Sequence, residues 1–139
     1  MSASRRLIAI LLLTGLSGLA ASGARAEDEA EAFDLSQYDD ANACVFTNSI
    51  RDFSVIDRRN LVIEASGRRT YLVTLFSSCF GLNFAHSLAF SSTSGRICGN
   101  SNDKIYLGRG EVCRINGIIR VESEEIAEKI VEARASDSE

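Results

Sequence analysis

Residues 57–76, DRRNLVIEASGRRTYLVTLF, contain the clearest strand pattern in this chain of 139 residues. Residues 61–65 and 70–76 are rich in β-branched, aliphatic and aromatic side chains, which favour extended backbone. A short polar segment precedes each of these two runs, and residues 50–56 add a third run of near-alternating apolar side chains. Three such runs joined by short polar turns predict an antiparallel meander.

Further short strands are predicted after the meander, at residues 87–91, 104–107, 112–115 and 118–121. Residues 81–86 predict a helical turn. Asn116-Gly117 is a preferred sequence for a tight hairpin turn, so we expect it to separate the last two strands. This many short strands in one domain predicts a mainly β fold, either a small barrel or a strongly bent antiparallel sheet.

A C-terminal helix is predicted to begin after Ser123 and to run to about Arg134. Serine is a favoured N-cap residue, and two glutamates follow it in the first turn, where the helix dipole favours acidic side chains. Ile126 and Ile130 lie on one face of this helix. Glu125 and Lys129 have the spacing of an ion pair along the helix.

The first 26 residues have the pattern of a secretory signal peptide. Arg5 and Arg6 give a positive start, residues 7–19 form a short apolar run, and Ala24-Arg25-Ala26 is a small-x-small cleavage site. The apolar run is too short for a stable membrane span. Ser22 occupies the position where a lipoprotein would carry its acylated cysteine, so we expect a soluble, periplasmic protein after cleavage near Ala26.

Four cysteines, an even number, are typical of two disulfides in a small exported chain: Cys44, Cys79, Cys98 and Cys113. No C-x-x-C spacing occurs, so neither a zinc ribbon nor a thioredoxin-like dithiol is encoded locally. Three pairings are possible. We predict Cys79–Cys98, which would close a loop and hairpin, together with Cys44–Cys113, which would tie the first strand to one of the last.

Three regions are predicted in the exported part of the chain. Residues 27–42 are predicted to be an acidic, flexible arm, residues 43–135 a single disulfide-tied β-rich domain with its C-terminal helix, and residues 136–139 a disordered tail. Residues 41–122 contain ten basic and six acidic side chains, although the whole chain has a net charge of −4. The acidic arm is most simply a solvated segment, and the alternative is that it masks the basic body.

Two arginine pairs, Arg58-Arg59 and Arg68-Arg69, fall in the predicted turns of the meander and form a candidate anion-binding site. Consecutive hairpins place their turns at opposite ends of a sheet, so the two pairs are not expected to form one patch. Solvated turn arginines are the simpler interpretation. Nucleic acid is excluded as a partner because the exported chain is acidic and lacks a binding motif.

His86 is the imidazole on which any Ser-His or Cys-His site would have to be built. Ser77, Ser78, Cys79 and Ser87 are near it in sequence, but no G-x-S-x-G motif is present. The scattered carboxylates of the body show no spacing typical of a catalytic pair. The sequence therefore predicts no catalytic residue, no cofactor and no metal.

The placement of several motifs is similar to that of a known family. These motifs are Cys44-Val45-Phe46, Ile50-Arg51-Asp52-Phe53, residues 56–63, residues 71–75 followed by Cys79, Arg96-Ile97-Cys98, Asp103-Lys104-Ile105 and Cys113-Arg114-Ile115. In these the chain resembles an uncharacterised family of small exported proteobacterial proteins, known as a domain of unknown function. The resemblance covers about residues 43–125 and implies no activity, ligand or catalytic residue.

Three functions follow as hypotheses. The first is a non-enzymatic binding or interaction module of the bacterial envelope, with an unknown envelope component or protein as its partner. The second is an inhibitor of a periplasmic hydrolase such as a lysozyme, by analogy with other small disulfide-tied β folds. The third is a small envelope enzyme centred on His86, which requires a nucleophile or carboxylate in the same pocket.

Overall fold

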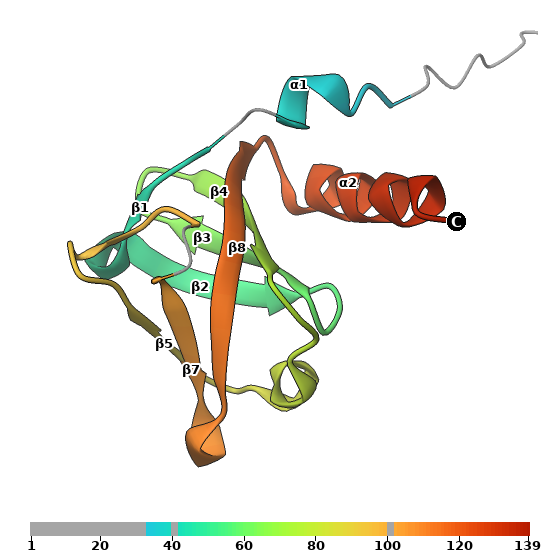
Figure 1. Cartoon of the computed structure of the whole chain (residues 1–139). Coiled ribbons are helices and arrows are strands. Elements are labelled where there is room, and N and C mark those ends of the chain that lie inside the picture. The colour runs from blue at the N-terminus through green and yellow to red at the C-terminus, as the bar shows by residue number, and fades with distance from the viewer. Residues whose placement is uncertain (1–32, 40–41, 100–101) are drawn as a thin grey trace, which may run out of the picture.

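The computed structural model describes residues 33–39, 42–99 and 102–139. The elements in chain order are α1 (Ser36–Asp39), β1 (Val45–Phe46), η1 (Thr47–Ser49), β2 (Ile50–Val55), β3 (Asn60–Ala65), β4 (Arg69–Leu75), η2 (Phe80–Phe84), β5 (Leu88–Ser91), β6 (Arg96–Ile97), β7 (Lys104–Leu107), η3 (Gly108–Gly110), β8 (Val112–Val121) and α2 (Glu124–Asp137), where η marks a 3-10 helix (Figure 1). The predicted signal peptide lies outside the described residues. Within them, no helix is both long and apolar enough to cross a membrane.

The strands form an antiparallel half-barrel. Its six-stranded sheet has the order β2-β3-β4-β8-β7-β5, and β1 and β6 form a separate two-stranded ladder. The predicted meander is confirmed, because β2 pairs with β3 and β3 with β4 in consecutive antiparallel register. The mainly β class, the strongly bent sheet, the C-terminal helix and the two disulfides are all confirmed.

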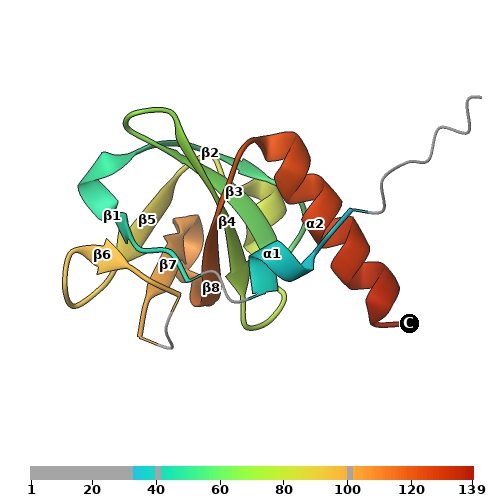
Figure 2. The same ribbon diagram turned by 90° about the horizontal axis from the view of Figure 1, so that it is seen from above.

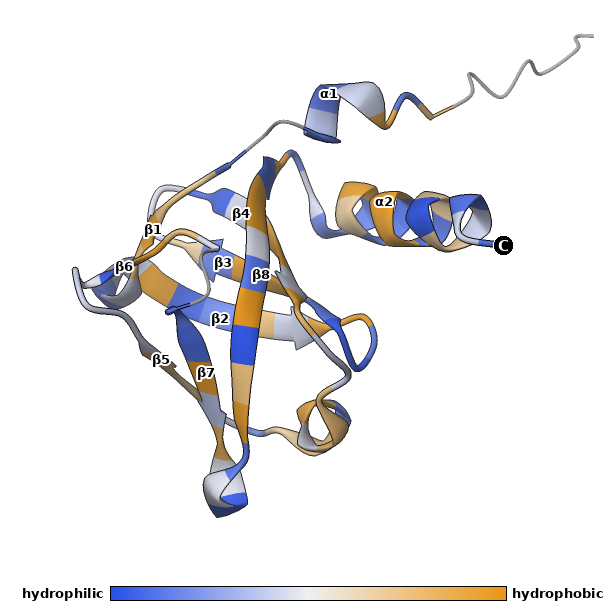
Figure 3. Cartoon of the chain, in the orientation of Figure 1, coloured by the Kyte–Doolittle hydropathy of each residue, from blue (hydrophilic) through white to orange (hydrophobic). Residues whose placement is uncertain are grey.

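Two apolar clusters lie on the two faces of the central strands because side chains alternate along each strand. The inner cluster fills the half-barrel, and its fully buried members include Leu61, Ile63, Val73, Leu75 and Ile115. The outer cluster contains Val62 and Leu72 from the same strands, and α2 covers it with Ile130 and Ala127. Figure 3 shows the alternation as successive hydrophobic and hydrophilic bands on β7 and β8.

The predicted hairpin turn at Asn116-Gly117 is wrong, because both residues lie inside the continuous ten-residue strand β8. Thr74 pairs with Gly117 and Leu75 with Ile115, so Asn116 is the extra residue of a β-bulge. The bulge switches the faces of β8: Ile115 and Ile118 point into the inner cluster, whereas Ile119 belongs to the outer one. One strand can therefore pair with both β4 and β7 and contribute to both cores.

The predicted disulfide pairing is also wrong: the bonds join Cys44 to Cys98 and Cys79 to Cys113. Val45 pairs with Ile97 in the β1–β6 ladder, which places Cys44 opposite Cys98 with a Cα–Cα distance of 4.1 Å. Cys79 follows the end of β4, next to its neighbour β8, and lies 6.1 Å from Cys113 between Cα atoms. Strand pairings that are distant in sequence therefore decide which cysteines meet.

Part of the segment that we expected to be a flexible arm is packed against the body. The Tyr38 side chain of α1 is buried in the outer cluster, and its hydroxyl donates a hydrogen bond to Glu122 Oε2 at 2.8 Å. Burial, and then the neighbouring Glu122 carboxylate, raise the pKa of Tyr38 to about 12. Figure 2 shows α1 and α2 on the same side of the sheet.

The C-terminal helix begins as predicted, with the Ser123 hydroxyl accepting a hydrogen bond from the Ile126 amide. The predicted pair of Glu125 and Lys129 is present with an N–O distance of 2.9 Å. The hydrogen bond from the Lys129 ammonium group, and then its positive charge, hold the pKa of the Glu125 carboxyl below its usual range. The helix continues to Asp137, beyond the predicted end at about Arg134 and into the segment that we expected to be disordered.

Candidate interaction surface

The two arginine pairs lie at opposite ends of the sheet, as their positions in consecutive turns predicted. Arg58-Arg59 is in the β2–β3 connection, and Arg68-Arg69 is where the β3–β4 connection enters β4. The six-residue strand β3 between them spans about 20 Å. The pairs therefore have separate surroundings.

Acidic side chains offset the charge of Arg68-Arg69. Both arginines line a depression of about 340 Å³ that is also lined by Glu64, Glu122 and Glu124. The Arg69 Nε donates a hydrogen bond to the Ser66 carbonyl at 2.9 Å, within its own turn. This end of the sheet is consequently mixed in charge and does not form a cationic patch.

The Arg58-Arg59 turn is adjacent to exposed phenylalanine rings instead. The Arg58 guanidinium lies 4.8 Å from the centre of the Phe80 ring, which is a cation–π contact. Arg114 makes the same contact with Phe76 at 5.0 Å. Phe76 and Phe80 are 43% and 66% exposed, so each ring presents apolar area beside a charge. We call these residues the arginine–phenylalanine surface: Arg58, Arg59, Phe76, Phe80 and Arg114.

Backbone hydrogen bonds join the segments that carry this surface. The Cys79 amide donates to the Arg58 carbonyl at 2.7 Å, so η2 starts beside the β2–β3 turn. The Phe76 amide donates to the Arg114 carbonyl at 3.1 Å, which extends the β4–β8 pairing past the end of β4. The Arg59 Nη2 reaches the Phe76 carbonyl at 3.4 Å. Three segments distant in sequence are therefore held together at one place.

Arg58, Arg59 and Arg114 have no ion-pair partner among the described residues. The described part of the chain contains one salt bridge, between Lys129 and Glu125 on α2. The nearby Asp57 carboxylate accepts hydrogen bonds from the amides of Arg59 and Asn60 and from the Asn60 side chain, which shapes the turn. The guanidinium groups of Arg58 and Arg114 are consequently available to an external anion, whereas Arg59 Nη2 is directed to the Leu75 and Phe76 carbonyls.

The outer face of β7 and β8 continues this surface. Arg114 is directly opposite Lys104, and Val112 is directly opposite Tyr106. Tyr106 and Val112 are 41% and 46% exposed. A third arginine–phenylalanine contact joins Arg96 to Phe46 at 5.4 Å on the separate β1–β6 ladder (Figure 2).

Sequence reasoning missed Arg114, Phe76 and Phe80. Arg58 and Arg59 stand out in the sequence because they are adjacent and in a turn. Arg114 is a single basic residue in an alternating strand, and the signal that could have indicated its exposure was its place between the buried Cys113 and Ile115. Its meeting with Phe76 depends on the β4–β8 pairing, which no local pattern predicts.

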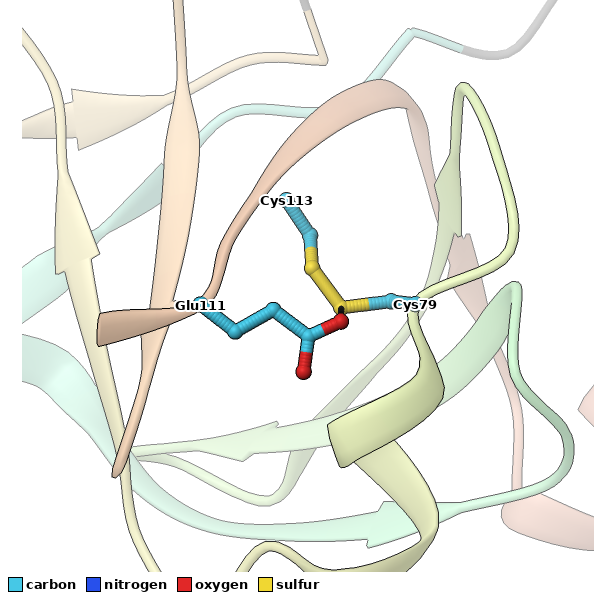
Figure 4. Close-up of side chains that lie close together, drawn as sticks. All are labelled: Cys79, Glu111 and Cys113. Atoms are coloured by element: carbon cyan, nitrogen blue, oxygen red, sulfur yellow. Dashed lines mark hydrogen bonds between the residues drawn. A yellow bond between two sulfur atoms is a disulfide. The ribbon is translucent and has the colours of Figure 1, made fainter. Parts of the chain in front are cut away.

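The four cysteines are all in disulfides, so they are structural in this state. Figure 4 shows the Glu111 carboxylate against the Cys79–Cys113 bond. Glu111 Oε1 lies 3.6 Å from Cys79 Sγ, and Glu111 Oε2 accepts a hydrogen bond from the Gly81 amide at 2.8 Å. These three side chains have the donor atoms of a metal site. However, thiolates are the metal ligands that cysteine supplies, and the two sulfurs are bonded to each other.

His86 is exposed on the wall of a cleft of about 760 Å³, which Ser87, Arg109 and Glu111 also line. The residue types required by an enzyme therefore share one cleft. Within the described ranges, however, no hydrogen bond joins His86 to Ser87 or Glu111, and the Glu111 carboxylate is engaged by the Gly81 amide. Arg109 adopts a left-handed backbone conformation (φ 72°) in η3, at the rim of this cleft.

Comparison with known proteins places the chain in a family without assigning an activity. A family model described as a family of unknown function (DUF6491) matches residues 2–137. No curated protein and no solved structure matches the chain.

Proposed function

We propose a function from the surface of this chain, which belongs to the family of unknown function DUF6491. The protein is a non-enzymatic interaction module of the bacterial envelope, and its arginine–phenylalanine surface binds an acidic face of a partner protein. The observation that carries this proposal is that Arg58 and Arg114 stack on exposed phenylalanine rings and have no ion-pair partner in the described part of the chain.

The chemistry of the surface favours a protein partner. Arginine and aromatic side chains are enriched at protein interfaces and dominate their binding energy. A guanidinium group can bind a carboxylate through two parallel hydrogen bonds, and a flanking ring excludes water from that contact. Phe80 is 66% exposed beside Arg58, so apolar burial and charge pairing can occur at one place.

Two features support an exported location. Two disulfides fit an oxidising compartment outside the cytoplasm. The N-terminal 26 residues have the order of charge, apolar run and cleavage site that export signals have. We infer that the protein works in the periplasm after cleavage near Ala26.

An NMR titration with a hexaglutamate peptide tests the surface. We expect the Nε–H signals of Arg58, Arg59 and Arg114 to shift more than those of Arg68 and Arg69, where nearby glutamates offset the charge. The shifts should shrink as salt is added, because exposed charges are screened. Equal shifts at Arg68 and Arg58, or none, would contradict the proposal.

A parallel titration with phosphatidylcholine vesicles containing phosphatidylglycerol tests the other anionic partner that an envelope offers. Signal loss with the vesicles but not with the peptide would overturn the protein partner in favour of a lipid surface. The Arg58→Glu variant should lose the peptide response. The matched variant Arg68→Glu, which reverses a charge at the opposite end of the sheet, should keep it.

A further inference from the structure

The half-barrel is open along one seam, between β2 and β5. These two strands are the ends of the six-stranded sheet, and in the described residues neither has a ladder partner on its outer side. A groove of about 470 Å³ follows the seam and is lined from both strands, by Phe53 of β2 and by Leu88 and Phe90 of β5 among others. The seam shares no residue with the arginine–phenylalanine surface.

The free edge of β5 can be identified from the neighbouring hydrogen bonds. The Leu107 amide donates to the Glu111 carbonyl, and the Ile115 amide donates to the Asp103 carbonyl. Because backbone groups alternate in direction along an antiparallel strand, the N–H and C=O groups of Lys104 and Tyr106 point to β5. Their partners are Ser91 and Ala89, so the N–H and C=O groups of Leu88 and Phe90 point away from β7 and into the seam.

The free edge of β2 is partly protected. The Ile56 amide donates to the Asn60 carbonyl, so the same alternation directs the backbone of Phe53 and Val55 to the seam. The Phe53 amide, however, donates to the Asp52 carboxylate at 2.8 Å. A side chain that occupies an edge amide in this way protects a strand from pairing. In the described residues the edge amides of Leu88 and Phe90 have no such bond.

The side chains of the groove fit an extended peptide. Phe53, Leu88 and Phe90 are half-buried and pack against the inner cluster, so they form an apolar floor. The rim is polar and mixed in charge, with Arg51 and Asp52 on one side and His86 on the other. A strand with alternating side chains would place one set on this floor and the other set towards water.

We propose that the β5 edge binds an extended segment of a partner protein, which adds to the sheet as an antiparallel strand. Its backbone pairs with the N–H and C=O groups of Leu88 and Phe90, and its apolar side chains cover Phe53 and Phe90. This mode of recognition takes its affinity from main-chain hydrogen bonds and its specificity from pockets for alternate side chains. It goes beyond the function proposed above, because it uses a different face.

Hydrogen exchange measured by NMR tests this site on the full chain. The probe is an acetylated and amidated six-residue peptide of alternating threonine and valine. At a peptide concentration of ten times Kd, the exchange of the Leu88 and Phe90 amides should slow by about tenfold, because only the free protein exposes them. Unchanged exchange at both amides would overturn the proposal, and so would protection confined to Phe53 and Val55 of β2.

Two variants separate backbone pairing from side-chain contact. Leu88→Pro removes the edge N–H at the first residue of β5, a position where proline is tolerated. Leu88→Ala shortens the same side chain but keeps the N–H. Protection of Phe90 should disappear in Leu88→Pro and persist in Leu88→Ala, and persistence in both would contradict strand addition. If Leu88→Pro fails to fold, the slowed or unchanged exchange of the Leu88 and Phe90 amides in the unmodified protein still tests strand addition. Arg58→Glu should leave the protection unchanged, so this site can fail or succeed independently of the arginine–phenylalanine surface.

Discussion

The Cys79–Cys113 disulfide should contribute more to stability than the Cys44–Cys98 disulfide, although it closes the shorter loop. The perturbation is the replacement of each pair by alanine, Cys44→Ala with Cys98→Ala, and Cys79→Ala with Cys113→Ala. The bonds close separations of 54 and 34 residues. Loop-closure entropy alone then gives losses of about 4.2 and about 3.8 kcal/mol.

Burial reverses this order. Cys79 and Cys113 are 2% and 8% exposed and belong to the inner cluster, whereas Cys44 is exposed. Each buried sulfur replaced by hydrogen leaves a cavity of about methyl size, which costs about 1 kcal/mol. We therefore expect losses of about 4 kcal/mol for the Cys44/Cys98 variant and about 6 kcal/mol for the Cys79/Cys113 variant.

Urea unfolding of the three proteins, with the remaining disulfide verified by non-reducing peptide mapping, measures both losses. A Cys79/Cys113 variant that is unfolded without urea agrees with the larger loss. Equal losses, or a larger loss for Cys44/Cys98, would refute the reasoning that burial outweighs loop length here.

Three further changes have expected outcomes. Tyr38→Phe should remove from the absorbance titration the tyrosine with a pKa of about 12. Because the folded state raises this pKa, the stability that Tyr38 confers is complete below the ordinary value of about 10 and is lost as the pH rises through about 12. The free energy of unfolding of Tyr38→Phe should therefore fall less than that of the unmodified protein between these two pH values. An unchanged absorbance titration would contradict the burial of Tyr38 in α1. Gly99→Ala should cost about 2 to 4 kcal/mol in urea unfolding, because φ is +71° and the added Cβ would lie 2.7 Å from Gly117 Cα. The control Gly95→Ala, with φ +73° and no described atom within 4 Å of its Cβ, should cost about 1 to 2 kcal/mol, and equal losses would rule out the close contact. Ser123→Ala should cost about 1 kcal/mol of stability by removing the N-cap of α2, and a loss near zero would show that the cap is dispensable.

Local patterns were sufficient for the elements whose causes are local. The runs at residues 61–65 and 70–76 became β3 and β4, and Ser123 caps α2 as its position predicted. In each case the residues that determine the element lie within or next to it. The separation of Arg58 from Arg68 followed from the same reasoning, because one strand joins their two turns.

Features that depend on distant strand pairing could not be predicted. Asn116-Gly117 has the composition of a tight turn, but β4 pairs with β8 on both sides of Asn116, and this pairing favours a bulge within one strand. The pairing of Cys44 with Cys98 depends on the two-residue strands β1 and β6, which are too short to give a periodic signal. The contact between Arg114 and Phe76 likewise depends on the pairing of β4 with β8, which are distant in sequence.

Photo-crosslinking in living cells tests most directly whether the arginine–phenylalanine surface binds a partner. Benzoylphenylalanine replaces Phe80, which is 66% exposed beside Arg58, and in a control it replaces Phe46, which is 55% exposed beside Arg96. We predict a discrete protein adduct from position 80 that disappears when Arg58→Glu is added and persists when Arg68→Glu is added. An adduct from position 46 but not from position 80, or one that survives Arg58→Glu, would contradict the proposed binding surface.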